Sequence, residues 1–198
     1  METILFLLAL VPFYLIGSFP SGYLVSKHYG VSIGSHGSGN VGATNVTRIL
    51  GARPGSLTLV VDIAKGVLAA GLANWWSQDP VFTAWSGVAA VCGHCFSLPP
   101  LLKGGKGVAT SLGAVLYLAP TVAMAGILMF AAVTALSRYV SLGSVTAVLS
   151  TPVVAAFVGA EGHLLASLAM IAAVVTWRHR ANLQRLAEGR ELRLGQTR

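Results

Sequence analysis

The segment Gly107-VATSLGAVLYLA-Pro120-TVAMAGILMFAAVTA-Leu136 decides the fold, because it contains no charged residue and is too long for one ordinary membrane crossing. A continuous helix of about 30 residues would be about 45 Å long, whereas the hydrocarbon core of a bilayer is about 30 Å thick. Proline lacks a backbone N–H and stops or kinks a helix. The segment is therefore either one tilted helix or two short helices that meet at Ala119-Pro120.

The composition places the whole chain in a membrane. Hydrophobic residues make up 55% of the 198 residues and charged residues only 10%, whereas a soluble domain carries about 25% charged residues. Five further apolar segments are candidate helices, at about 4–25, 56–76, 81–98, 141–159 and 163–177. The first has no basic residue before it, so we expect a retained helix rather than a signal peptide. We expect a single integral-membrane domain over residues 1–198.

The distribution of Lys and Arg favours two helices in the segment 107–136. Every Lys and Arg except Lys65 falls in one of four groups, namely Lys27, Arg48 and Arg53; Lys103 and Lys106; Arg138; and the tail from Arg178 onward. Two helices put all four groups on one side, which the positive-inside rule makes cytoplasmic. We therefore predict an all-α polytopic membrane helix bundle of about seven transmembrane helices, with the N-terminus outside and the C-terminus cytoplasmic. Because the net charge of +7 is confined to these short groups, we expect no nucleic-acid partner.

The first segment whose residues suit ligand binding is Gly34-SHGSGNVGATNVT-Arg48, in the longest loop, 30–54. Its glycines permit positive φ, and successive backbone N–H groups in such a loop form an anion nest. Further donors are supplied by Ser38, Asn40, Thr44 and Asn45, and Arg48 adds a planar fork suited to phosphate. A flexible polar linker is the alternative, although a linker has no need of these donors.

The second segment is Lys103-Gly104-Gly105-Lys106-Gly107, directly before a predicted helix. Free N–H groups and the helix dipole bind anions at such a position. The alternative is that the two lysines only set membrane topology. No Walker A pattern is present.

The third segment begins with Arg178-His179-Arg180 and continues to Gly189. If the preceding helix continues, His179 and Asn182 share one of its faces. A basic tail on anionic membrane lipids would explain the arginines but not the histidine and the asparagine. Both interpretations stay open.

Ionisable residues also occur inside the apolar segments. Asp62 and Lys65 lie three apart on one helix face, and form either a structural tie that orients the site or a direct ligand contact. His94 is either a general base or an interior histidine. It lies within Cys92-Gly-His-Cys95, which we interpret as packed cysteines because no thioredoxin-like pattern surrounds it. We expect no metal site and no cofactor.

Taken together, these motifs resemble those of the bacterial acyl-phosphate:glycerol-3-phosphate acyltransferase family. The resemblance covers about residues 15 to 195 and is carried by the motifs at 37–48, 62–66, 93–96, 103–110, 137–144 and 178–186. It implies an inner-membrane enzyme that acylates the sn-1 hydroxyl of glycerol 3-phosphate, in the first step of phospholipid synthesis. The donor would be an acyl phosphate, and the products lysophosphatidic acid and phosphate.

The resemblance also implies roles for individual residues. Phosphate-contacting and catalytic roles would fall on Ser38, Asn40, Arg48, Lys106, His179 and Asn182, with Ser144 a weaker assignment. The sequence Ser97-Leu-Pro-Pro-Leu-Leu departs from the family pattern and puts the local acyl-chain contact in doubt. We expect direct attack without an acyl-enzyme, with the proton passing to a substrate phosphate or to His179, and functional coupling to an enzyme that produces acyl phosphate. A transporter of organic phosphates is the alternative, but the predicted outer side lacks the polar lining that transport needs.

Overall fold

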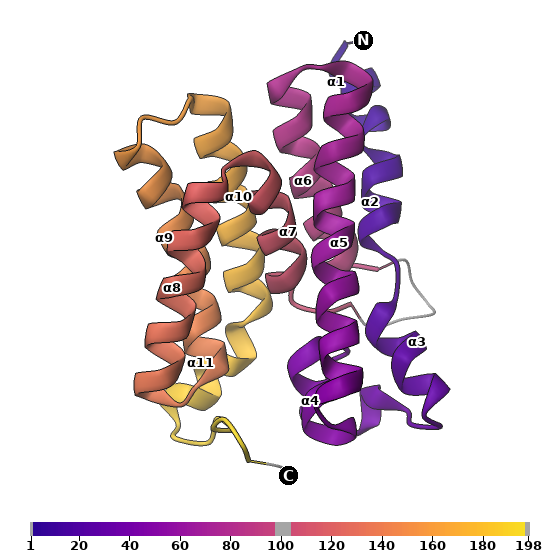
Figure 1. Ribbon diagram of the computed structural model, residues 1–198, viewed down its shortest axis with the longest axis vertical. Helices are drawn as coiled ribbons and strands as arrows, with labels where there is room; N and C mark the ends of the chain where they lie inside the picture. The colour runs from indigo at the N-terminus through magenta and orange to yellow at the C-terminus, as the bar shows by residue number, and fades with distance from the viewer. Residues whose placement is uncertain (1, 98–103, 197–198) are drawn as a thin grey trace.

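The computed structural model describes residues 2–97 and 104–196, and within these ranges all regular structure is helical (Figure 1). The helices are α1 (Glu2–Ala9), α2 (Val11–Gly17), α3 (Ser21–His28), the short 3-10 helix η1 (Ile33–Ser35), α4 (Ala43–Leu50), α5 (Ala52–Ser77), α6 (Pro80–Cys95), α7 (Val108–Leu118), α8 (Pro120–Ser137), α9 (Val140–Phe157), α10 (Gly162–Arg178) and α11 (Arg180–Ala187). The all-α prediction is confirmed for this part of the chain.

The apolar segment 107–136 forms two helices, α7 and α8, as the distribution of Lys and Arg predicts. The chain leaves the helical conformation at Ala119, where φ is −154° and ψ is 79°, and α8 begins at Pro120. Helix α7 then packs against α5, whereas α8 runs back along α9 (Figure 1). The proline therefore ends one helix and starts an antiparallel one.

Four helical runs in the described ranges are long and apolar enough to cross a membrane, namely residues 2–28, 52–77, 120–137 and 140–157. Helices α7 and α10 are apolar but shorter. The count of seven crossings and the orientation stay predictions.

The first apolar segment is not the single straight helix that the sequence predicts. Helices α2 and α3 are separated at Phe19-Pro20, because Pro20 has no N–H for a helical hydrogen bond. The predicted loop 30–54 also contains structure, since it holds η1 and α4 and ends where α5 begins.

Helices α5 and α7 approach closely because glycines face each other across the contact. A Cβ at Gly66 would collide with the backbone carbonyl oxygen of Thr110, and one at Gly113 with that of Ile63. Small residues allow such backbone contact, which contributes packing energy between helices in a lipid environment.

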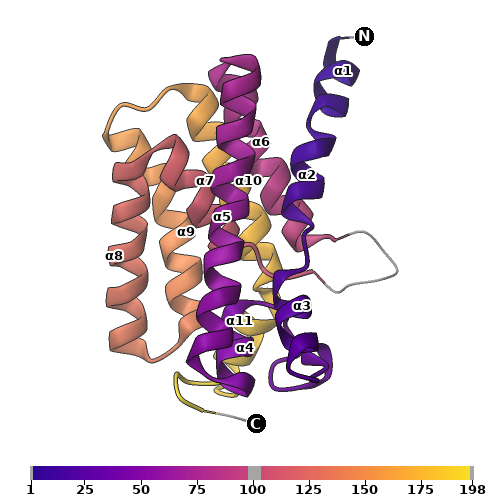
Figure 2. The same ribbon diagram turned by 45° about the vertical axis from the view of Figure 1, so that its right-hand side comes forward.

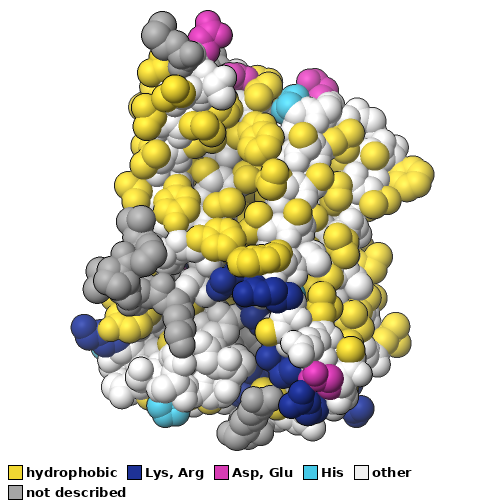
Figure 3. All heavy atoms as spheres, turned by 180° about the vertical axis from the view of Figure 1, so that it is seen from behind, with side chains coloured by type: hydrophobic (Ala, Val, Ile, Leu, Met, Phe, Trp, Pro, Cys, Tyr) yellow, Lys and Arg dark blue, Asp and Glu magenta, His cyan; other side chains and the backbone are white. Residues whose placement is uncertain are grey.

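Helices α6 and α7 are too short to run the length of the bundle. The C-terminal end of α6 and the N-terminal end of α7 both lie near the mid-height of the bundle. Helix α5 continues past them toward the end where the C-terminus lies (Figures 1 and 2). Lys and Arg side chains gather over the lower half of the molecule, toward the C-terminus, where an acidic side chain lies among them, and other acidic side chains lie at the opposite tip (Figure 3). The lower ends of these two short helices therefore lie within the height of the bundle, above its basic end.

We predict that Gly66→Ala destabilises the protein although alanine favours helices. The overpacked contact should cost about 1–3 kcal/mol, more than the gain of about 1 kcal/mol in helix propensity. Thermal unfolding in detergent measures this. Gly71→Ala on the same helix is the control, because its Cβ would make only ordinary contact with the Tyr117 ring. An unchanged unfolding temperature for Gly66→Ala would contradict the close packing.

Candidate active site

The glycine-rich segment is organised around the buried side chain of Asn45. Its Nδ2 donates to the carbonyl oxygens of His36 and Asn40, at 3.0 and 2.9 Å, and its Oδ1 accepts from the backbone N–H of Ser38 at 2.9 Å. Gly37 and Gly39 adopt the positive φ that the sequence predicts for glycines of this segment, whereas Gly42 has a φ of −74°. Asn45 therefore shapes the turn from within, while the side chains of Ser38 and Thr44 are exposed at its surface.

Arg48 lies on α4, directly after this turn. Its Nε donates to the carbonyl oxygen of Gln196 at 2.9 Å, and its Nη1 lies 3.5 Å from Asn45 Oδ1. The guanidinium group is therefore held between the glycine-rich turn and the C-terminal tail.

The turn at Gly104 and Gly105 is held from two sides. The backbone N–H of Gly105 donates to the carbonyl oxygen of His94 at 2.9 Å. From the end of α10, Arg178 donates from Nη2 to the carbonyl oxygen of Gly104 at 2.8 Å and from Nε to that of Gly105 at 3.0 Å. The chain then reaches the start of α7 through Gly107, whose φ of +84° favours glycine.

Lys106 follows this turn and faces a group of charges from three other parts of the chain. Burial lowers the pKa of Lys106 to about 8; Glu191 opposes the shift, and Arg185, Arg48 and Arg178 add to it. The first and second sequence motifs therefore meet the tail around Lys106. A lysine with a lowered pKa among arginines is a site at which an anion is favoured.

His179 is buried at the junction between α10 and α11. Its Nδ1 lies 2.7 Å from the carbonyl oxygen of Val175, which can only accept, so the proton is on Nδ1 and Nε2 carries the lone pair. Burial and the charge of Lys106 lower its pKa to about 4, so the ring is neutral at pH 7. The helical run is interrupted at this residue, because α10 ends at Arg178 and α11 starts at Arg180.

Glu191 is the residue that the sequence analysis missed. Its Oε1 accepts from Asn182 Nδ2 at 2.6 Å and from Ser141 Oγ at 2.8 Å, and its Oε2 pairs with Arg185 Nε at 2.8 Å. Burial alone would raise the pKa of Glu191, but these three hydrogen bonds outweigh burial and lower it. The signal available in the sequence was an acidic residue in a tail rich in arginine.

The structure thus brings together most of the predicted residues. Arg48, Lys106 and His179 surround one charged region, and Asn182 joins it through Glu191. Ser144 stays a prediction: it is buried on α9, one turn after Ser141, and its hydroxyl donates to the carbonyl oxygen of Val140. Lys103 lies outside the described residues.

A second polar group lies on the other side of the glycine turn, between α5 and α6. It consists of Asp62, Lys65 and His94, all buried. In residues 2–97 and 104–196, no three His, Cys, Asp or Glu side chains converge as metal ligands.

We predict that Glu191→Gln lowers the free energy of unfolding by about 2 kcal/mol at pH 7, because it removes the charge from three hydrogen bonds. The native pKa is lowered, so this stabilisation is complete above the ordinary glutamate value of 4.5 and is lost as the pH falls through the native pKa. Thermal unfolding from pH 3 to 7 should therefore show a smaller acid-dependent loss in the variant than in the wild type. Glu188→Gln, at an exposed position three residues earlier, is the control. Equal acid dependence in Glu191→Gln and the wild type would contradict the assignment.

Known proteins resemble this chain in both sequence and fold. A sequence profile of the family described as glycerol-3-phosphate acyltransferase matches residues 7–189. Curated proteins of that description from Trichlorobacter lovleyi and Thermus thermophilus are 44% and 40% identical, the first over 90% of this chain and 92% of its own, the second over 92% of each. A crystal structure of PlsY, an integral membrane glycerol 3-phosphate acyltransferase, in its glycerol 3-phosphate form matches with a TM-score of 0.90 and 39% identity over 96% of each chain. The chain therefore belongs to the glycerol-3-phosphate acyltransferase family of integral membrane proteins.

Proposed function

We propose that the protein transfers a fatty acyl group from acyl phosphate to the sn-1 hydroxyl of glycerol 3-phosphate, giving lysophosphatidic acid and inorganic phosphate as the first step of phospholipid synthesis. The observation that supports this most directly is the group of cations around Lys106, which collects Arg48, Arg178 and Arg185 from separate segments. Both substrates carry a phosphate, and arginine and lysine at the end of an apolar bundle suit two anions, one of which bears a fatty tail.

The reaction needs orientation and charge stabilisation rather than a nucleophile from the protein. The acceptor oxygen attacks the carbonyl carbon of the acyl phosphate, and the bond from that carbon to the phosphate oxygen breaks, so that phosphate leaves with the electron pair. Lys106 and Arg48 stabilise the departing phosphate, and the backbone N–H groups in the first turn of α7 are donors for the oxyanion. No acyl-enzyme is required, because the donor is already activated.

The proton of the attacking hydroxyl goes to a substrate phosphate. Burial and the charge of Lys106 lower the pKa of His179, which makes it a weak base. His179 therefore accepts a hydrogen bond at Nε2 and orients the hydroxyl.

The remaining predicted residues complete the site around this centre. Ser38, Asn40 and Thr44 offer side-chain donors at the glycine-rich turn, and Asn45 maintains its shape. Asn182, held by Glu191, contacts the acceptor. The basic end lies on the cytoplasmic side of the bacterial inner membrane, where an enzyme that produces acyl phosphate supplies the donor.

We predict that purified protein releases phosphate from acyl phosphate only when glycerol 3-phosphate is present, with lysophosphatidic acid as the second product. Lys106→Ala should lower kcat by about 100-fold or more, since it removes charge stabilisation at the reacting centre. Phosphate release and product analysis measure this, with Lys27→Ala as a control at a lysine outside the site. Retained binding of glycerol 3-phosphate without turnover on acyl phosphate would overturn the proposed donor.

We predict that the fall of kcat/KM at high pH, the upper limb of the pH profile, reflects the loss of a proton from Lys106. Because its pKa is lowered to about 8, kcat/KM should fall as the pH rises above about 8 and the ammonium loses its proton. In Lys106→Arg the limb should move above pH 10, because guanidinium stays charged. The position of the limb, not the absolute rate, is the measurement. An identical limb in both proteins would assign it to another group.

A further inference from the structure

The buried group formed by Asp62, Lys65 and His94 is more elaborate than a tie between two helices requires. Asp62 and Lys65 lie three apart on α5 and pair at 2.9 Å, and Ser21 Oγ donates to the same carboxylate oxygen at 2.6 Å. This pairing alone would compensate both charges. Yet the shortest contact of Lys65 Nζ, at 2.7 Å, is to Nδ1 of His94 on α6. The lysine therefore also acts on the histidine.

The contacts of Lys65 determine which nitrogen of His94 carries the proton. Lys65 Nζ has three donors and three acceptors within reach, namely Asp62 Oδ1, the carbonyl oxygen of Phe19 at 3.1 Å and His94 Nδ1. Lysine can only donate, so Nδ1 must accept. Asp62 Oδ1 is farther from Nδ1, at 3.5 Å, and does not compete. The proton of the neutral ring is therefore on Nε2.

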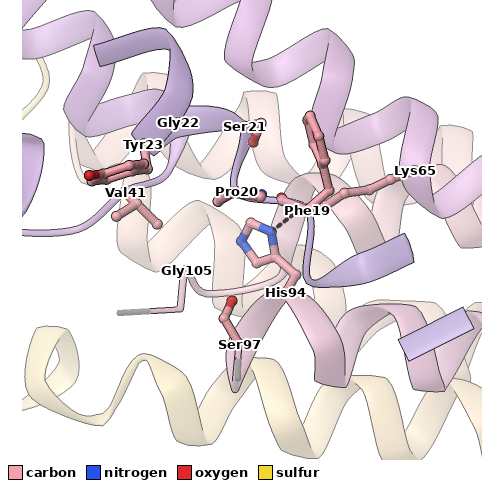
Figure 4. Close-up of a pocket in the computed structure, with 10 residues that line it drawn as sticks. All are labelled: Phe19, Pro20, Ser21, Gly22, Tyr23, Val41, Lys65, His94, Ser97 and Gly105. Atoms are coloured by element: carbon pink, nitrogen blue, oxygen red, sulfur yellow. Dashed lines mark hydrogen bonds between the residues drawn. The ribbon is translucent and has the colours of Figure 1, made fainter. Parts of the chain in front are cut away.

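The opposite edge of the His94 ring faces the glycine turn. The imidazole stands between Lys65 and Gly105 in the pocket that these residues line (Figure 4). A Cβ at Gly105 would collide with His94 Nε2, and the backbone N–H of Gly105 donates to the carbonyl oxygen of the same histidine. His94 thus contacts Gly105 through both its ring and its backbone, one residue before Lys106.

We propose that Asp62, Lys65 and His94 are positioning residues for the acyl transfer. Asp62 orients Lys65, Lys65 fixes the tautomer and rotation of the His94 ring, and the ring holds the backbone of Gly105. Arg178 holds the same turn from its other side. Together they set where Lys106 and the start of α7 meet the phosphate. The inference rests on the proposed function in that Lys106 is the group being placed.

The first test exchanges the pair for neutral residues, so that no uncompensated charge stays buried. In Asp62→Asn/Lys65→Met we expect kcat to fall at least about tenfold, because small displacements of a positioned group cost up to about 100-fold, while the unfolding temperature changes little. Glycerol 3-phosphate binding, measured by calorimetry, should weaken too, and this readout does not depend on which donor the enzyme uses. Wild-type binding without turnover on acyl phosphate would count against the donor, not against this inference. Unchanged kcat and unchanged binding in a folded variant would overturn the positioning role.

The second test is a double-mutant cycle between the ring and the turn. Gly105→Ala should lower kcat by about 100-fold when His94 is present, whereas in His94→Ala it should cost less than about threefold more, because the colliding ring is gone. Gly162→Ala, whose Cβ would meet open space, is the control. Independent, multiplying losses would overturn the inference. The two tests use different variants. If a variant in one test fails to fold, the other test still decides whether these residues position the turn.

Discussion

The hydrogen bonds from Arg178 to the carbonyl oxygens of Gly104 and Gly105 are the interaction on which the site depends. Gly105 is buried just before the start of α7, where little water is available to satisfy the backbone carbonyl groups of the turn. Arg178, at the end of α10, satisfies two of these groups and also lies over the Phe96 ring. The same residue therefore connects the two short helices to the opposite half of the bundle and sets the height at which Lys106 lies.

Charge is distributed around this turn in two layers. On the side of the apolar bundle, Asp62 and Lys65 compensate each other, and Lys65 donates to Nδ1 of His94. Around Lys106, the cations Arg48, Arg178 and Arg185 outnumber the carboxylate of Glu191, which is itself engaged by Asn182, Ser141 and Arg185. An anionic substrate would compensate the excess positive charge around Lys106. It would find no uncompensated charge at Asp62 and Lys65. This difference assigns binding to the basic side and support to the buried side.

The family membership and the physical features of the site agree with each other. An acyl chain belongs in an apolar bundle, and a phosphate belongs among lysine and arginine at its end. A neutral His179 beside Lys106 is a weak base, so the chemistry must rely on the reactivity of the substrates. The tail, through Glu191, closes the site from below and links α9 and α11.

The amino-acid sequence by itself determined the all-helical membrane fold, the helix break at Ala119-Pro120 and the three motifs, because each depends on residues close together in the chain. Only the tertiary structure decided that Arg178 holds residues more than 70 positions earlier, and that His94 is pressed against Gly105. It also decided that Glu191 organises Asn182, and that the helix stops at His179. Such contacts leave no local periodicity or spacing in the sequence, since they arise only when packed helices bring distant segments together.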